Sequence, residues 1–208
     1  FLHCVCMKKI ILICNKVSVR TIREIKRLLF VFPRIMKYRL LSNCNNFSGE
    51  INRIQPVLFT GKGRIEIRNN VQAGVSRSPY FYNSYIYIEA RCTSSFVVIG
   101  DNVSINNNVS IISSGAGIEI GEYTLIGHSV EIIDSDFHGL GVNQRASEYA
   151  LAAKVVIGSN VFIGNGVKVL KGVKIGDNSV IASGSVVTSD VETNAVYAGI
   201  PARFVKQL

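Results

Sequence analysis

The sequence is poor in the residues from which metal sites and disulfide frameworks are built. Its 208 residues include 3 histidines, 5 cysteines and no tryptophan. The cysteines form an odd set with no CxxC pair and no Cys/His spacing typical of metal sites: Cys4, Cys6, Cys14, Cys44 and Cys92. Such a set favours reduced thiols and therefore a cytoplasmic location.

Long apolar runs are also missing. No stretch approaches the roughly 18 residues that a bilayer-spanning helix needs, and no small-residue cleavage site follows the apolar patch at residues 10–13. The sequence begins with Phe1, so Met7 is a candidate natural start. A chain of 208 residues with 48% hydrophobic content is expected to form one domain with its own core.

Acidic residues are scarce in the first third of the chain. Residues 1–68 hold 14 of the 23 lysines and arginines but only Glu24, Glu50 and Glu66, which gives 14 − 3 = +11. The other 140 residues carry nine bases and eleven acids, a balance of −2. The net charge of +9 therefore belongs to the N-terminal segment.

What the sequence does have is an aliphatic residue every six positions. The clearest run is Ile157, Ile163, Val169, Ile175, Ile181 and Val187. Neither a helix, with a period of 3.6, nor a flat strand, with a period of 2, explains this spacing. A chain coiling as a three-sided prism does, and hexapeptide arrays are typical of parallel β-helices. Three hexads make one coil, so Ile157 should stack on Ile175, Ile163 on Ile181 and Val169 on Val187.

The residues between the hexads suit tight corners. Ile99-Gly100-Asp101-Asn102 is repeated as Ile157-Gly158-Ser159-Asn160 and as Ile175-Gly176-Asp177-Asn178. Glycine lets the backbone turn closely, and asparagine accepts left-handed dihedral angles more readily than other non-glycine residues.

Two interruptions of the repeat are candidate functional segments. Residues 76–87 carry Tyr80, Phe81, Tyr82, Tyr85 and Tyr87, either as an aromatic wall for a sugar ring or as packing for a loop or interface. Residues 133–154 hold about seven residues more than one coil needs, which predicts a loop excursion. This excursion contains Asp134, Asp136 and His138.

The basic N-terminal segment shows a helical pattern. Ile22, Ile25, Leu29 and Phe32 recur at helical spacing with basic residues between them, and Pro33 should end or kink the helix. The favoured interpretation is a cap whose apolar stripe packs on the first coil. The other is a basic amphipathic helix that brings residues 1–41 into peripheral contact with an anionic membrane, at its inner face. Basic charge alone is not a nucleic-acid-binding motif, so no nucleic-acid partner is expected.

Residues 155–206 read VVIGSNVFIGNGVKVLKGVKIGDNSVIASGSVVTSDVETNAVYAGIPARFVK. Over residues 63–206 the chain resembles the hexapeptide-repeat acyltransferases, in particular the sugar O-acetyltransferase branch acting on galactosides, maltose and polysaccharides. The resemblance implies an all-β, left-handed parallel β-helix, and the helical spacing of residues 22–32 adds a short helical N-terminal cap. The expected parts are a basic, partly helical cap (1–60), a β-helix (61–192) with the excursion (133–154), and a C-terminal tail (193–208).

The resemblance also implies a reaction: transfer of an acetyl group from acetyl-CoA to a hydroxyl of a sugar, or of a capsular or lipid-linked polysaccharide. In the family a loop histidine is the general base, and His138 is the match. An imidazole with a reference pKa of about 6.5 suits this task. Asp134 or Asp136 would hold the second ring nitrogen and fix the tautomer. His128 is expected to be an exposed turn residue.

Further site residues are implied by position in the family. Asn106 matches an asparagine that contacts the acceptor. Asn165 and Ser183 match contacts to the pantetheine arm of coenzyme A, and Thr188, Arg203 and Lys206 match residues near its adenosine phosphates. The family's acidic acceptor-binding residue has no counterpart at residues 112–115, which leaves the sugar specificity open.

The family is usually a homotrimer with active sites shared between chains, so a homotrimer acting on a small-molecule or glycan acceptor is implied. Three alternatives stay open: an amino-sugar N-acetyltransferase, a serine acetyltransferase and a non-catalytic structural solenoid. The long helical amino-terminal domain of serine acetyltransferases is absent. A carbonic-anhydrase-like β-helix needs three zinc-binding histidines, but the coil region has only His128 and His138, so no metal is expected.

Overall fold

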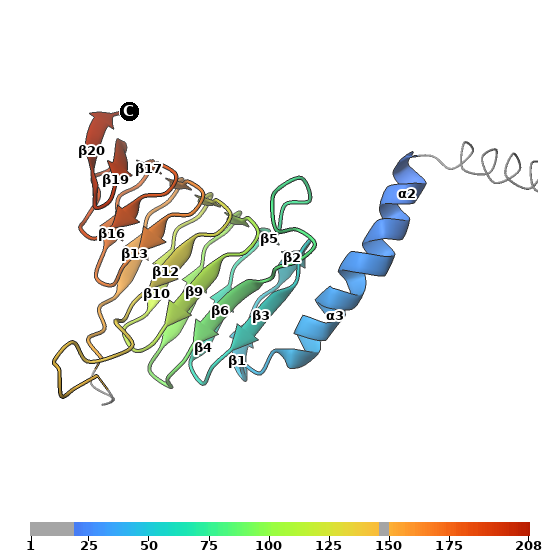
Figure 1. The fold of residues 1–208 in the computed structure, drawn as a ribbon, viewed down its shortest axis with the longest axis horizontal. Helices are drawn as coiled ribbons and strands as arrows, with labels where there is room; N and C mark the ends of the chain where they lie inside the picture. Colours follow the sequence, from blue (N-terminus) through green and yellow to red (C-terminus); the bar gives the residue numbers. More distant parts are fainter. Residues whose placement is uncertain (1–18, 146–149) are drawn as a thin grey trace, which may run out of the picture.

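The structure, a computed structural model, describes residues 19–145 and 150–208. From residue 46 onward the chain winds as a stack of coils whose parallel strands form the three sides of a prism (Figure 1). A helical segment precedes the stack and extends away from its first coil. Among the described residues, no helix combines the length and the apolar character needed to cross a membrane.

Each side of the prism is one sheet. Sheet A contains β1 (Asn46–Ser48), β4 (Arg64–Ile67), β7 (Phe96–Ile99), β10 (Ile118–Ile120), β13 (Val155–Ile157) and β16 (Lys174–Ile175). Sheet B contains β2 (Ile51–Arg53), β5 (Val71–Ala73), β8 (Ser104–Ile105), β11 (Leu125–Ile126), β14 (Phe162–Ile163), β17 (Val180–Ile181), β19 (Ala195–Gly199) and β20 (Ala202–Gln207). Sheet C contains β3 (Val57–Thr60), β6 (Ile86–Ala90), β9 (Ser110–Ser113), β12 (Glu131–Ile133), β15 (Lys168–Val169) and β18 (Val186–Val187).

The stacking predicted from the period of six is confirmed. Ile157 pairs with Ile175, Ile163 with Ile181 and Val169 with Val187, each in a parallel ladder. These side chains point inward and are buried in one continuous core of isoleucine and valine. Parallel strands about 4.8 Å apart let every coil bury its apolar row on the next one.

The corner between sheets A and B confirms the predicted turn chemistry. Asn102, Asn160 and Asn178 have φ angles of 57°, 54° and 58°, the left-handed region in which asparagine is tolerated. Their side chains also bond from coil to coil, because Asn160 donates to Asn178 at 2.9 Å and Asn178 to Asn194 at 2.8 Å. The asparagine is therefore both a turn residue and a link between coils.

The β-helix starts earlier than residue 61, the boundary predicted from the hexads. Residues 46–60 already form a complete first coil, β1, β2 and β3, which pairs in register with β4, β5 and β6. The predicted tail, 193–208, contains β19 and β20, an antiparallel hairpin that extends sheet B. The hexad pattern missed the first coil because only part of it has aliphatic residues at the inward positions.

The helical segment does not end at Pro33. It consists of α2 (Val19–Lys26), a π-helical turn η1 (Arg27–Val31) and α3 (Phe32–Leu41). Proline has no N–H to donate to the preceding turn, and the wider π turn directly before it is where the backbone adjusts.

The expectation that the apolar stripe packs on the first coil is wrong for this segment. Ile25, Leu29 and Phe32 are 48%, 60% and 51% exposed. The contact is made by the other side of the helix: Val31 is buried, the ring of Tyr38 stacks on Tyr85, and Arg34 donates to the carbonyls of Phe81 and Ser84.

Candidate active site

The loop excursion leaves the prism at the corner between sheets C and A and is fixed there by Asp134. This carboxylate is fully buried and accepts four hydrogen bonds, from the Ser113 hydroxyl at 2.7 Å and the backbone N–H groups of Ser114, Ala116 and Gly117 at 2.6, 3.0 and 2.7 Å. Asp134 therefore anchors the excursion to the short loop 113–117 one coil earlier, instead of orienting His138 as the sequence suggested.

Asp136 contacts the following coil of the stack, whereas Asp134 contacts the preceding one. Its Oδ1 accepts from Lys171 Nζ at 2.7 Å, which ties the excursion to the following coil. Its Oδ2 is buried with no hydrogen-bond partner among the described residues. The neck of the excursion is closed by a bridge between Ser135 and Ala152. Asp136 thus also has a partner other than the His138 ring.

His138 lies beyond this neck and is exposed. Its Nδ1 is 3.0 Å from the carbonyl oxygen of Arg145. A carbonyl only accepts hydrogen bonds, so in the neutral ring the proton sits on Nδ1, and Nε2 carries the lone pair. A backbone carbonyl of the same loop therefore fixes the tautomer, the role that we expected of Asp134 or Asp136.

The residue before His138 is held by a network of which the sequence analysis named only Tyr87. Phe137 has a φ of 61°, and the guanidinium of Arg91 lies 4.8 Å from its ring centroid. Arg91 makes a two-point contact with Glu89 at 3.0 and 2.9 Å, and the Tyr87 hydroxyl donates to the same carboxylate at 3.0 Å.

This Tyr87–Glu89–Arg91 network is well suited to hold a loop. The hydrogen bond to Glu89 raises the pKa of Arg91, and burial raises the pKa of Tyr87 to about 12, so the cation stays charged and the phenol stays protonated. Tyr87 and Glu89 occupy alternate positions of β6, and Arg91 directly follows the strand with the same spacing. That period-2 spacing of Tyr, Glu and Arg is the signal that could have identified the network.

A second set of predicted residues meets at the corner between sheets B and C. The Asn165 side-chain oxygen accepts from the His128 backbone N–H at 3.0 Å, and the Ser183 hydroxyl accepts from the Asn165 N–H at 3.1 Å. Asn106 lies at the same corner one coil before His128, half-buried, with its side-chain oxygen bonded to the Asn107 N–H at 2.7 Å. The structure thus brings Asn106, Asn165 and Ser183 onto one edge of the prism.

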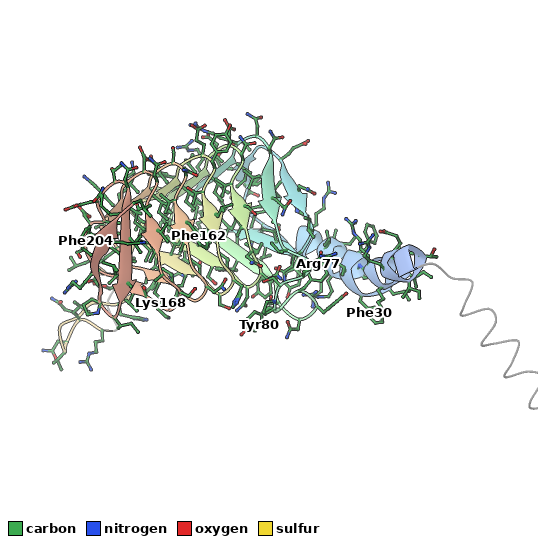
Figure 2. The ribbon with its side chains drawn as sticks, turned by 90° about the horizontal axis from the view of Figure 1, so that it is seen from above. Phe30, Arg77, Tyr80, Phe162, Lys168 and Phe204 are labelled. Carbon is green, nitrogen blue, oxygen red and sulfur yellow. The ribbon has the colours of Figure 1, made fainter. Side chains whose placement is uncertain are left out.

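An aromatic loop covers this edge. Tyr80, on the loop that projects from the side of the stack in Figure 2, places its ring 5.6 Å from the His128 ring. The loop is held by Asn107, which is fully buried and bonds to Val75 and Pro79 through its side chain. Of the three consecutive asparagines, Asn107 is therefore structural. Asn106 stays half-buried at the edge, and the exposed Asn108 takes the left-handed turn conformation and donates to the Ser129 hydroxyl at 3.1 Å.

The remaining predicted residues lie on the C-terminal coils. Thr188 follows β18, and Arg203 and Lys206 lie on β20; all three are exposed. The guanidinium of Arg203 donates to the carbonyl of Ala202 at 3.1 Å. Over residues 19–145 and 150–208, no group of three or more His, Cys, Asp or Glu side chains is placed to hold a metal ion.

His138 and Asn106 lie at opposite edges of sheet C. The excursion emerges where the sheet C strands end, and the 106–108 corner lies where they begin (Figure 1). The strand between the two corners in the Asn106 coil, β9, is four residues long, which corresponds to about 13 Å. Within one chain the two predicted groups therefore flank a whole side of the prism.

Comparison with known proteins agrees with this architecture. The bacterial transferase hexapeptide family (six repeats) matches residues 154–189. No curated protein sequence matches the chain. A galactoside acetyltransferase in complex with coenzyme A is similar at 30% identity and a TM-score of 0.57, over 68% of this chain and 64% of the other, so the chain spans less than two thirds of that relative.

Two further structures are similar. A hexapeptide-repeat-containing acetyltransferase from Vibrio cholerae, complexed with acetyl coenzyme A, shares 30% identity over 67% of this chain and 70% of its own, with a TM-score of 0.52. The polySia-specific acetyltransferase NeuO shares 25% identity over 80% and 74%, with a TM-score of 0.53. The predicted fold class, a left-handed parallel β-helix, is confirmed. The chain belongs to the hexapeptide-repeat acetyltransferases, a family of acyltransferase enzymes.

Proposed function

We propose that this protein is an acetyl-CoA-dependent O-acetyltransferase that acetylates a hydroxyl group of a sugar or polysaccharide, with His138 as the general base. The observation that carries the proposal is the bond between His138 Nδ1 and the Arg145 carbonyl, which leaves the basic nitrogen, Nε2, to take the proton of an acceptor hydroxyl. Acetyl-CoA supplies the acetyl group as a thioester whose leaving group is a thiol. Galactoside and polySia-specific acetyltransferases among the similar structures support a glycan acceptor.

The chain offers fitting contacts for the coenzyme. Asn165 and Ser183 expose polar groups at the B–C corner, where the pantetheine arm would lie. Arg203 and Lys206 add exposed cations on the terminal hairpin, and Thr188 adds an exposed hydroxyl on the last coil; phosphate oxygens prefer such donors. The cytoplasmic location favoured by the cysteine pattern remains a prediction.

The proposal includes a homotrimer whose active sites lie between chains. In one chain His138 and Asn106 lie at opposite edges of sheet C, whereas both groups would need to be within hydrogen-bond reach of one acceptor hydroxyl. If the excursion of one subunit lies against the B–C corner of the next, His138 of the first and Asn106 of the second share one cleft. Cyclic symmetry would then form three such sites.

The test of the reaction is thiol release from acetyl-CoA in the presence of neutral sugars and oligosaccharides, amino sugars, or serine. We expect turnover with the neutral sugars or oligosaccharides, which offer only hydroxyl groups. His138→Ala should lower kcat by about 10²- to 10⁴-fold, the usual contribution of a general base. His128→Ala is the matched control, because it keeps the backbone N–H that bonds Asn165 and should keep most of kcat. Turnover only with amino sugars or only with serine would replace the neutral glycan as acceptor, and full activity of His138→Ala would remove the base from its role.

The shared site has a separate test. His138→Ala and Asn106→Ala should each be poorly active alone. When the two variants are co-expressed, about a quarter of the sites should be active, because these combine an intact His138 of one chain with an intact Asn106 of its neighbour. No recovery in mixed oligomers would place both residues in a site within one chain.

A further inference from the structure

The outer side of the helical segment presents a row of large apolar side chains to solvent. We call Ile22, Ile25, Leu29, Phe32 and Met36 the outer stripe; all five are exposed. Leu28, Phe30 and Leu40 of the same segment are also exposed, by 62%, 59% and 82%. Contiguous exposed apolar patches of this kind mark interaction sites in soluble proteins.

The orientation of the stripe is fixed by the opposite side of the same helix. Val31 is buried, Tyr38 stacks on Tyr85 with a centroid distance of 4.4 Å, and Arg34 Nη1 donates to the Phe81 carbonyl at 3.1 Å. These contacts use the side that faces the first coil. In both views α2 lies beyond the end of the coils, and Phe30 is labelled on this projecting segment (Figures 1 and 2).

The charge of the segment selects its partner. Residues 19–41 contain seven bases (Arg20, Arg23, Lys26, Arg27, Arg34, Lys37 and Arg39) and one acid, Glu24, which gives 7 − 1 = +6. Arg23, Lys26 and Arg27 are exposed on α2 and η1, and Lys37 and Arg39 on α3. An apolar stripe with basic residues beside it is the arrangement that settles at a lipid–water interface, the stripe among the acyl chains and the cations at the headgroups.

We propose that the outer stripe docks this enzyme on an anionic lipid surface, with helix 19–41 lying in the plane of the headgroups. Each lysine or arginine near such a surface adds to the attraction, and the buried apolar side chains hold the helix in place. The docking is independent of the acetyl-transfer proposal, because the stripe lies at the N-terminal end of the stack, away from His138 and the C-terminal coils.

A second copy of this chain is a poorer occupant of the same face. Pairing two outer stripes would bring two segments of +6 together with only one acidic residue in each to offset them. Like charges placed opposite one another oppose association, whereas phosphate headgroups neutralise them. Charge complementarity therefore selects the lipid surface over self-association.

The first experiment measures co-sedimentation of the full chain with vesicles of phosphatidylcholine alone or with about one third phosphatidylglycerol. Binding is expected only to the anionic vesicles at low salt, and it should fall when salt shortens the Debye length to about 3 Å. Leu29→Ser with Phe32→Ser should weaken binding at least about tenfold, since fully burying each side chain is worth roughly 1.5–3 kcal/mol. Tyr123→Ser, which removes a comparably exposed ring from a distant corner, is the control.

The second experiment exploits the absence of tryptophan. Leu29→Trp introduces a single indole into the outer stripe, and its emission should shift to shorter wavelength with anionic vesicles. Tyr123→Trp, outside the stripe, should show no shift. The proposal is overturned if anionic vesicles do not bind the protein, if the stripe substitutions leave binding unchanged, or if those substitutions alter only the oligomeric state, which would make the stripe an interface between copies.

Discussion

Two corners border sheet A, and they are built by opposite rules. From Asn70 to Asn178 the A–B corner repeats one short turn, whose left-handed position is an asparagine in every coil except one, where it is Tyr123. The C–A corner carries insertions in three successive coils: residues 91–95, 113–117 and 134–154. The regular corner sets the spacing of the stack, while the irregular one carries Arg91, Asp134 and His138. In this molecule, regular stacking and the predicted catalytic loop thus lie at different corners of the same prism.

The largest effect on stability is expected at the irregular corner. Asp134→Ala removes a buried carboxylate and leaves four donors without their acceptor. We expect the free energy of unfolding, measured in urea, to fall by about 4 kcal/mol, as when one partner of a buried charged network is removed. Asp177→Ala is the control at the regular corner, where the exposed carboxylate accepts from the Ser159 N–H at 2.7 Å, and should cost about 1 kcal/mol. Equal losses would remove the special anchoring role of Asp134.

A smaller loss of unfolding free energy is expected when a methyl group is added to a glycine of the regular corner. A Cβ on Gly121 would lie 2.5 Å from the carbonyl carbon and oxygen of Gly158 in the next coil, and backbone cannot move aside without breaking the ladder. Gly121→Ala should therefore lower the free energy of unfolding by roughly 2–3 kcal/mol. Gly184→Ala meets no atom within 4 Å but has a φ of 74°, so only the left-handed conformation is strained, at about 1–2 kcal/mol. The same urea titrations compare the two, and a larger loss in Gly184→Ala would show that dihedral strain dominates.

The regular part of the fold could be predicted from the sequence because its contacts are periodic. The pairing of Ile157 with Ile175 in sheet A was indicated by spacing alone, and the structure extends the same row to Ile120 and Ile99. Each coil touches only its neighbours, so a local repeat fixes the long-range register. The first coil escaped notice because Phe47 and Phe59 fill positions that later coils give to isoleucine and valine, and their rings pack together at 4.6 Å.

The side-chain roles at the site could not be predicted in the same way. Asp134 was placed beside His138 because the two are close in sequence, but stacking brings the loop 113–117 closer to it. The Arg145 carbonyl carries no signal in a residue pattern, since every residue has one. The position of His138 within an excursion was predictable; its hydrogen-bond partner depended on how the loop folds back.

The smallest effect is expected from a substitution at Phe137, which tests whether this ring positions the loop or only stabilises the fold. Phe137→Leu removes the ring that Arg91 covers at 4.8 Å and leaves the Arg91–Glu89 contact in place. Phe96→Leu is a matched control, because the guanidinium of Arg64 lies 5.7 Å from that ring on sheet A. Both variants should lose about 0.5–1 kcal/mol of unfolding free energy, the size of an exposed cation–π contact.

Only Phe137→Leu should also slow the reaction. Phe137 precedes His138, so a loosened backbone there displaces the proposed base, and small misplacements at a reacting group are costly. We expect kcat for acetyl transfer to fall by about threefold to tenfold with an unchanged KM for acetyl-CoA, whose predicted contacts lie on other coils. Equal kcat values in the two variants would mean that the contact between Arg91 and Phe137 supports the fold without positioning His138.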